Sequence, residues 1–367
     1  MKILILTKRQ YMNKDLLDDR YGRFWEIPYA LSSFGHNIHG LCLSYKKRSE
    51  GVFKDTVIWE SINAGMLKLP GLLKFIRRAD HLASKSDIIF ACSDAFYGVI
   101  AAFFSKKHHV PMLFDLYDNF EYYLSGRLPI LKQLYRWAVR NSDLVTCISQ
   151  PLQNLLYSYG IKGNSIVLEN AVKKNLFYPM AQSSCRRSLN LPLSAQLVGT
   201  AGALTKNRGI EVLFAAFEIL SSTLPNLHLV LAGPRNVRIP CNDRIHDMGN
   251  LPFEKVPTFI NALDVAVICN EDNSFGRYCF PQKAREIMAC NVPIVAANIG
   301  SIAALFHKNP EWLYKTGSVT DLAKSISNRL KDKSTDYVII PNWGELAREL
   351  SDKIKVIERR TEKVIMQ

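Results

Sequence analysis

The feature that most constrains the fold is a series of short apolar runs, each bounded by turn residues and separated from the next by a helix-like segment. The first half of the chain contains KILILT, HNIHGLCL, DIIFACS, PMLFDL, LVTCIS and SIVLEN. Many of these runs are apolar on both faces, as strands of a parallel sheet covered by helices must be. The first half therefore predicts a doubly wound α/β domain.

The pattern restarts after a polar segment with two prolines. The runs QLVGTAGAL, LHLVLAG, DVAVICN and VPIVAA predict a second sheet, and an apolar stripe at helical spacing between the first two predicts a helix that packs on it: Ile210, Leu213, Phe214, Phe217 and Leu220. We predict one Rossmann-like domain over residues 1–175, joined by a C-terminal helix at 342–367 that packs back towards it, and another over 176–341. Such domains carry ligand-binding loops at the carboxyl ends of their strands, facing a cleft.

Composition excludes several other classes of protein. The 48% hydrophobic content argues against disorder. No apolar run approaches the length of about 18 residues expected of a membrane span, and the N-terminus is unlike a signal peptide. The eight cysteines form no CxxC pair and several lie in apolar runs. We therefore expect reduced core cysteines in a cytoplasmic protein.

The net charge of +14 favours an anionic partner, such as a phosphate ligand or an anionic membrane face, although a diffuse charge is also typical of a solvated surface. Residues 66–85 interleave leucines with Lys74, Arg77 and Arg78, and residues 120–140 are similarly rich in aromatic and basic side chains. Each segment predicts either a peripheral contact with the inner face of a membrane or a helix that covers the first sheet with its cations in water. Nucleic-acid binding would rest on net charge alone, so we expect none.

The loop in GTAGALTKNRGIEVLFAAF is a candidate phosphate site. A strand ends in a glycine-containing turn, and Lys206 and Arg208 come just before a helix that starts near Gly209. Backbone N–H groups at a helix start, with cations beside them, bind phosphate well. The alternative is an ordinary strand-to-helix turn with solvated cations.

The stretch FPQKAREIMACNVPIVAA predicts a short helix followed by a buried strand. Pro281 suits the helix start and Asn291 its C-terminal cap, with Ala284, Ile287 and Met288 on the inward face. Two charges, Lys283 and Glu286, are then three residues apart on another face. They form either a surface ion pair or a site in which the carboxylate accepts hydrogen bonds from two sugar hydroxyls.

With these motifs the sequence resembles glycosyltransferase family 4, a group of retaining enzymes with the GT-B fold. The likeness rests on KNRGIEVLFAAF, LHLVLAGP, LDVAVICN and above all FPQKAREIMACNVPIVAANIGSIAALF, with SSFGHNIHGLCL, LVTCISQPLQNLL and IVLENAVKKNLFYP in the other half. It spans nearly the whole chain. The resemblance implies transfer of a sugar from a nucleoside diphosphate sugar to a hydroxyl of a glycan or lipid-linked glycan, as in polysaccharide biosynthesis.

The resemblance also implies roles for particular residues. Glu286 would bind the donor's ribose hydroxyls, and Arg208, assisted by Lys206, would neutralise its diphosphate. The other implied donor-binding residues are Gly22 and Arg23 after the first strand, Gly202 in the glycine turn, and Gly276, Arg277, Cys279, Phe280 and Lys283 near the helix start.

The catalytic candidates lie where the sequence departs from the family pattern. Tyr278 stands where the family often has a glutamate that contacts the transferred sugar, and Ala203 replaces a common arginine. Asp118 and Asn119 in FDLYDNFE replace a histidine-containing loop. A catalytically inactive nucleotide-sugar-binding protein of the same fold is therefore the alternative.

A metal site is the other alternative for the acidic residues. Asp15, Asp18, Asp19, Asp115 and Asp118 could supply oxygen ligands. We expect neither metal nor cofactor, because cations and helix N-termini already supply the positive charge that a leaving diphosphate needs.

Overall fold

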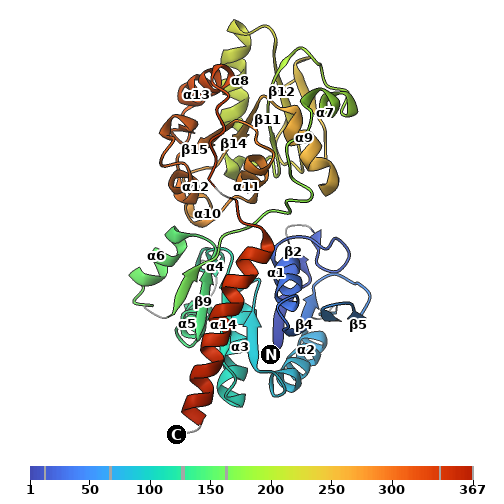
Figure 1. Cartoon of the computed structure of the whole chain (residues 1–367), viewed down its shortest axis with the longest axis vertical. Coiled ribbons are helices and arrows are strands. Elements are labelled where there is room, and N and C mark those ends of the chain that lie inside the picture. The colour runs from blue at the N-terminus through green and yellow to red at the C-terminus, as the bar shows by residue number, and fades with distance from the viewer. Residues whose placement is uncertain (12–13, 66–67, 125–128, 162–163, 339, 366–367) are drawn as a thin grey trace. The chain divides into compact units, whose positions relative to one another are not determined.

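The structure is a computed structural model that describes residues 1–11, 14–65, 68–124, 129–161, 164–338 and 340–365 (Figure 1). It consists of two compact units, which we describe separately. The N-terminal unit is Met1–Glu169 with Trp343–Gln367, and the C-terminal unit is Asn170–Asn342. The boundaries thus lie at 169/170 and 342/343, where the sequence predicted 175/176 and 341/342.

The N-terminal unit is built on an eight-stranded sheet in the order β10-β9-β8-β7-β1-β4-β6-β5. Its strands are β1 (Lys2–Lys8), β4 (Asn37–Ser44), β5 (Gly51–Lys54), β6 (Ile58–Asn63), β7 (Ile88–Ala91), β8 (Met112–Leu116), β9 (Leu144–Cys147) and β10 (Ser165–Val167). All pairings are parallel except that of β5 with β6. The doubly wound sheet is confirmed. Strand β6 was not predicted because polar residues interrupt its apolar pattern. One of them, Glu60, is ion-paired with Arg78.

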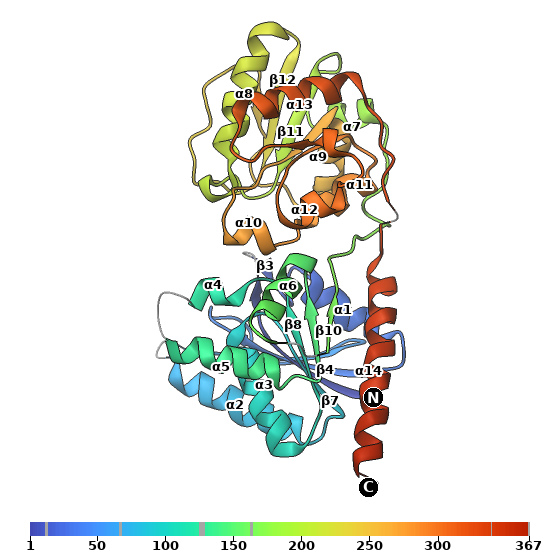
Figure 2. The ribbon, with the colours of Figure 1, turned by 90° about the vertical axis from the view of Figure 1, so that its left-hand side faces the viewer.

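Helices cover both faces of this sheet: α1 (Arg23–Ser32), α2 (Leu69–Ala83), α3 (Ala95–His108), α4 (Phe120–Leu124), α5 (Pro129–Arg140), α6 (Gln150–Ser158) and α14 (Trp343–Ile365). Figure 2 shows α2, α3 and α5 on one side and α1 with α14 on the other. The C-terminal helix packs on the N-terminal unit as predicted, since Ser351 bonds His36 over 2.8 Å and Arg348 lies over the Phe34 ring. Residues 366–367 of the predicted helix lie outside the described residues.

Helix α2 falls within the predicted basic segment 66–85, of which residues 66–67 lie outside the described part. Phe75, Ala79 and Ala83 form its buried face, whereas Leu69 and Leu73 are exposed. Phe75, Ala79 and Ala83 share this face because residues four apart on a helix lie one above the other. In the second predicted segment, residues 125–128 are likewise not described.

The C-terminal unit has a six-stranded parallel sheet in the order β13-β12-β11-β14-β15-β16. The strands are β11 (Gln196–Ala201), β12 (Leu227–Ala232), β13 (Ile245–Asp247), β14 (Val265–Ile268), β15 (Ile294–Ala297) and β16 (Leu313–Tyr314). The helices are α7 (Gln182–Ser188), α8 (Ile210–Thr223), α9 (Val256–Ala262), α10 (Ser274–Tyr278), α11 (Gln282–Ala289), α12 (Gly300–Leu305) and α13 (Val319–Lys331), with short 3-10 turns at Lys206–Arg208, Phe253–Lys255 and Pro310–Trp312.

The strand order fixes where ligands can bind. In the C-terminal unit the chain goes from β11 outwards through β12 and β13, then returns to β14 on the other side. In the N-terminal unit the reversal lies between β1 and β7. Loops diverge at such a switch point, leaving a crevice beyond the carboxyl ends of the two strands. Each unit therefore has one position at which a site is expected.

All eight cysteines are free and all but Cys241 are buried, as expected of reduced core residues. In the part of the chain that the structure describes, helices long and apolar enough to span a bilayer are absent.

Candidate functional site

Helix α11 carries the two charges that the sequence left with alternative roles. It begins after Pro281, whose φ of −66° suits a helix start, and it is followed by Asn291 in the left-handed region at φ 55°. Ala284, Ile287 and Met288 are buried, as predicted for the inward face.

Glu286 and Lys283 do not form a solvated surface pair. Glu286 is only 7% exposed, and burial raises its pKa to about 7, against the opposing effects of Lys283 and a hydrogen bond from Gln282. Burial, reinforced by the nearby Arg208 cation, lowers the pKa of Lys283 to about 8. Glu286 is thus buried and Lys283 half-buried in a site where charge is costly unless a partner is present.

A small cavity of about 10 Å³ adjoins these side chains, about the space that one water needs. Thr200, near the end of β11, lines it together with Lys283 and Glu286, and its Oγ1 is buried without a hydrogen-bond partner. Thr200 was not predicted from the sequence, although a threonine within the apolar run QLVGTA was the available signal.

The loop after β11 brings further positive charge to the same place. Gly202 has a φ of 119°, and a Cβ there would lie 3.6 Å from the Lys283 ammonium, so Lys283 reaches from α11 to this loop. Arg208 stacks over the Phe275 ring at 4.5 Å and is close enough to lower the pKa of Lys283. Lys206 is exposed and pairs with Glu211 over 3.5 Å.

Helix α10 and its cap hold the loops of β11 and β14 together. Asn273 accepts a hydrogen bond from the Gly276 N–H at 2.9 Å and donates one to the Asn207 carbonyl at 3.1 Å. At Gly276 only glycine fits, because a Cβ would lie 2.2 Å from the Glu271 carbonyl oxygen.

The remaining predicted residues of this stretch differ in exposure. Cys279 and Phe280 are buried and Tyr278 is half-buried at the end of α10. Arg277 is exposed and ion-paired with Asp272.

These residues form one constellation at the switch point of the C-terminal unit. Two cations, Arg208 and Lys283, lie close enough to repel each other, and the buried Glu286 carboxyl lies one turn further along α11. Such an arrangement suits a ligand whose anionic part meets the cations and whose hydroxyls meet the carboxylate.

A second site lies at the switch point of the N-terminal unit and was not anticipated from the sequence. This N-terminal pocket has a volume of about 490 Å³ and is lined by Lys8, Tyr45, Asp94, Ala95, Phe96, Tyr117 and Phe120. Lys8 ends β1, Asp94 follows β7 and Tyr117 follows β8, three neighbouring strands whose carboxyl ends meet at one edge. The available signal was a polar or aromatic residue at or just after the end of each strand: Lys8, Asp94 and Tyr117.

The predicted catalytic residues Asp118 and Asn119 lie beside this pocket and are buried. The Asn119 N–H donates to the Asp118 carboxylate at 2.7 Å. Burial lowers the pKa of Lys8, while Asp94 and Asp118 oppose that shift, so Asp118 faces the pocket ammonium closely enough to influence it.

The predicted role of Arg23 in binding a diphosphate is not supported. Its guanidinium is buried and bonds both oxygens of Asp115, at 2.7 and 2.9 Å, and also donates to the Leu168 carbonyl. Arg23 thus ties α1 to β8 and to the segment after β10. Gly22 precedes α1 with φ 80°, and a Cβ there would lie 3.1 Å from the Tyr11 ring.

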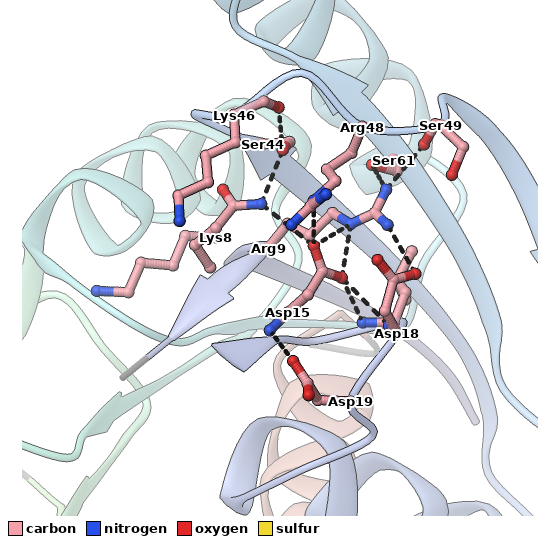
Figure 3. A network of polar contacts seen from close by, with 12 residues as sticks. Lys8, Arg9, Asp15, Asp18, Asp19, Ser44, Lys46, Arg48, Ser49 and Ser61 are labelled. Atoms are coloured by element: carbon pink, nitrogen blue, oxygen red, sulfur yellow. Dashed lines mark hydrogen bonds and ion pairs between the residues drawn. The ribbon is translucent and has the colours of Figure 1, made fainter. Parts of the chain in front are cut away.

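The loop between β1 and α1 is held by arginines rather than open to a metal (Figure 3). It includes a hairpin of β2 (Gln10–Tyr11) and β3 (Lys14–Asp15), and residues 12–13 are not described. Arg9 is fully buried and donates to Asp15 at 2.8 Å, to Asp18 at 3.2 Å and to Ser61 at 3.1 Å. Figure 3 shows Lys8 extending away from this network.

Those arginine and lysine partners account for most of the acidic residues that suggested a metal. Within the described ranges, no group of three or more His, Cys, Asp and Glu side chains could hold a metal ion. The expectation of metal-independent chemistry stays a prediction.

Comparison with known proteins decides the family. Residues 26–175 match the sequence model described as Glycosyltransferase Family 4, and residues 195–332 match the one described as Glycosyl transferases group 1. The chain belongs to the glycosyltransferases of family 4. Since each model matches one of the two Rossmann-like units, the resemblance inferred from the sequence is confirmed.

Two relatives illustrate the range of this glycosyltransferase family. The N-acetyl-alpha-D-glucosaminyl L-malate synthase of Bacillus anthracis is 25% identical over 66% of this chain and 62% of its own length. A putative teichuronic acid biosynthesis glycosyltransferase of Bacillus subtilis is 25% identical over 71% of this chain and 68% of its own length. The chain thus aligns with about two thirds of each relative.

Solved structures confirm the GT-B fold. Sucrose-phosphate synthase from Thermosynechococcus elongatus superimposes with a TM-score of 0.74 at 18% identity, covering 100% of this chain and 98% of that one. The Anabaena protein HepE in complex with UDP gives a TM-score of 0.70 at 17% identity and covers 100% of both chains. These likenesses establish the fold of this glycosyltransferase.

Proposed function

We propose that this protein transfers a sugar from a nucleoside diphosphate sugar to a hydroxyl of a glycan or lipid-linked glycan, with retention of anomeric configuration. The observation that carries the proposal is the set of Arg208, Lys283 and Glu286 at the switch point of the C-terminal unit. Two mutually repelling cations beside a buried carboxyl are a costly arrangement that a diphosphate and a ribose would relieve.

Each residue has a defined part in this proposal. Arg208 and Lys283 donate charge-assisted hydrogen bonds to the diphosphate oxygens. Glu286 accepts hydrogen bonds from the ribose hydroxyls, which favours its ionised form and so offsets the raised pKa. Gly202 lets the backbone approach the diphosphate, because its conformation at φ 119° excludes a side chain.

The chemical step follows from the donor. The acceptor hydroxyl oxygen bonds to the anomeric carbon, and the bond from that carbon to the diphosphate oxygen breaks. The electron pair of that bond leaves with the diphosphate, which also takes the hydroxyl proton. Arg208 and Lys283 stabilise the charge that develops on the leaving diphosphate. Asp118, Asn119 and Tyr278 are the candidates for contacts with the reacting sugars.

The names of similar proteins suggest which donor and which acceptor to test. HepE is described in complex with UDP and with UDP-glucose, which favours a uridine donor here. The name of the Bacillus subtilis relative favours polysaccharide biosynthesis. The Bacillus anthracis relative is named for L-malate, so a small anionic acceptor is the competing possibility.

The test is to replace Glu286 by Ala and titrate UDP-, GDP- and ADP-sugars by calorimetry. We expect at least tenfold weaker binding of the cognate donor, since a charge-assisted hydrogen bond contributes about 1.5–3 kcal/mol. Glu218, an exposed glutamate of α8, provides the matched Glu→Ala control. Equal donor affinity of E286A and E218A would remove the assignment.

A nucleotide-sugar-binding protein without transfer activity is the second candidate, motivated by Tyr278 in place of a glutamate. Incubation of the protein with its cognate donor separates the two, because an enzyme slowly releases free nucleoside diphosphate through reaction with water. Replacing Tyr278 by Glu should then raise the rate if the tyrosine is what limits transfer.

We also propose that the N-terminal unit rests on an anionic membrane through α2 and α5. Leu69, Leu73 and Ile130 are exposed by 61%, 45% and 66%, and Arg77 on α2 is an exposed cation. The positive charge of these helices complements anionic lipid, and burial of the exposed leucines in the lipid interface is favourable.

Co-sedimentation with phosphatidylglycerol and phosphatidylcholine vesicles tests the membrane contact. The variant L69S/L73S should lose binding to the anionic vesicles, whereas V356S, which changes an exposed valine of α14, should keep it. Equal sedimentation with both lipids, or of both variants, would contradict the contact.

A further inference from the structure

The N-terminal pocket is lined by charged and aromatic side chains that have no part in the proposed donor site. Its walls combine one cation, one carboxylate and four aromatic rings: Lys8, Asp94, Tyr45, Phe96, Tyr117 and Phe120. It lies at the switch point between β1 and β7, where ligands of doubly wound sheets bind. About 490 Å³ is enough for a ligand of the size of a sugar ring or a disaccharide end.

The pocket's positive charge is already compensated. The Lys8 ammonium lies 3.9 Å from the Asp94 carboxylate and 3.3 Å from the Tyr117 hydroxyl, with Asp118 also near enough to act on it. An anionic ligand would therefore share one ammonium with two carboxylates and be repelled by both. A neutral ligand with hydroxyl groups meets no such repulsion, because hydroxyls can donate to the carboxylates and accept from the ammonium.

The arginines of the network shown in Figure 3 are already paired with carboxylates. The buried guanidinium of Arg9 is taken by Asp15 and Asp18, and Arg48 lies 3.4 Å from Asp15. The Lys8 side chain extends away from this network and lines the pocket instead.

The aromatic walls suit the apolar face of a sugar ring. Tyr117 is fixed by ring contacts with Phe24 at 5.0 Å and Phe120 at 5.3 Å, so it is held in place before a ligand arrives. Tyr45 is hydrogen-bonded to Tyr97 over 3.3 Å. A pyranose presents C–H groups on one face and hydroxyls around its edge, which matches flat rings beside a few polar groups.

We infer that this pocket is the acceptor site and that it selects an uncharged sugar ring over an acceptor that carries a carboxylate or phosphate beside the reacting hydroxyl. The inference rests on the proposed function, since it names the acceptor class of that transfer. Lys8 and Asp94 bind the acceptor's hydroxyls, and Tyr117 with Phe96 packs against its ring.

The test uses pairs of ligands that differ in one group. The full chain, saturated with UDP, is titrated with the methyl glycosides of glucose, galactose and mannose and with the matching methyl hexuronides, followed by protein fluorescence and ligand-observed NMR. We expect at least one neutral glycoside to bind at least tenfold more tightly than its uronide. UDP is titrated separately, so that loss of nucleotide binding counts against the proposed function and leaves the pocket to be judged by the glycosides alone.

Two variants make the test specific. Asp94→Asn removes the negative charge but keeps the cap of α3, in which the side chain accepts from the Phe96 N–H at 3.1 Å, because Asn caps helices as well as Asp. It should reduce the discrimination between the paired ligands to threefold or less. Tyr117→Ala should weaken the neutral glycoside at least tenfold, while Tyr178→Ala, an exposed tyrosine of the C-terminal unit, should leave it unchanged.

Three results would overturn the inference. They are a uronide that binds as tightly as its neutral partner, discrimination that survives in D94N, and a protein that binds UDP but none of the neutral glycosides.

Discussion

Replacing Glu286 by Gln should make the ligand-free protein more stable above pH 7. Burial raises the pKa of this carboxyl from 4.5 to about 7, so between these values the folded state keeps a proton that the unfolded chain has lost. The resulting stability is complete below pH 4.5 and is lost as the pH rises through about 7. At about 1.4 kcal/mol per pKa unit, the loss is about 3 kcal/mol.

Glutamine keeps the size of the side chain without a charge. The variant should therefore gain up to about 3 kcal/mol at pH 8, which corresponds to roughly 2–4 °C in Tm per kcal/mol for a unit of this size. At pH 5 the folded wild-type carboxyl is mostly protonated, and the gain should fall to about 1 kcal/mol. UDP affinity should fall at least tenfold at pH 8, because the amide offers the ribose only one acceptor oxygen.

Thermal and urea unfolding at pH 5 and pH 8, with calorimetric titration of UDP, measure both effects. Lys283→Met is the matched control. The pKa of Lys283 is lowered from 10.5 to about 8, so its destabilising effect is complete below pH 8 and fades as the pH rises towards 10.5. K283M should therefore gain stability at both pH values. An equal gain for E286Q at pH 5 and pH 8, or a loss at pH 8, would refute the reasoning.

Three other substitutions separate structural from ligand-binding roles. Gly233→Ala should destabilise the C-terminal unit by several kcal/mol in urea unfolding. The φ of Gly233 is 129°, and the added Cβ would lie 2.1 Å from the Gly202 carbonyl oxygen. Unchanged stability would contradict that packing. Arg23→Met leaves the buried Asp115 with only the Thr146 hydroxyl and no cation, so the unfolding free energy should fall by about 3–5 kcal/mol. The folded protein should bind UDP as wild type, and a selective loss of UDP affinity would support the predicted donor role. Arg208→Ala should weaken UDP at least tenfold and leave uridine unchanged in calorimetry, and an equal loss for both would place the arginine away from the diphosphate.

The fold was predictable wherever a strand is apolar on both faces. All six apolar runs of the first half and all four of the second form strands, because burial between helix layers requires such runs. Strands β2, β3, β5, β6, β13 and β16 were missed. They are short or polar, and their pairing depends on a neighbouring strand rather than on their own residues.

The candidate site was predicted only in part. Glu286 and Arg208 were found because local motifs carry them, and their loops meet at a switch point as the topology requires. The bond of Arg23 to Asp115 was not predicted, since the two residues are 92 apart and no local pattern distinguishes an arginine that faces a ligand from one that bonds a buried carboxylate. The N-terminal pocket was missed for the same reason, because its residues follow three different strands.

The sequence by itself determined the two Rossmann-like units, the family and the helix on which Glu286 lies, since periodicity and short motifs are local properties of the chain. Only the tertiary structure decided that Glu286 is buried beside a half-buried Lys283, that Arg23 bonds Asp115 within the core, and that Lys8, Asp94 and Tyr117 share a pocket. Burial and pairing depend on which distant residues become neighbours, and these also set the pKa of each group.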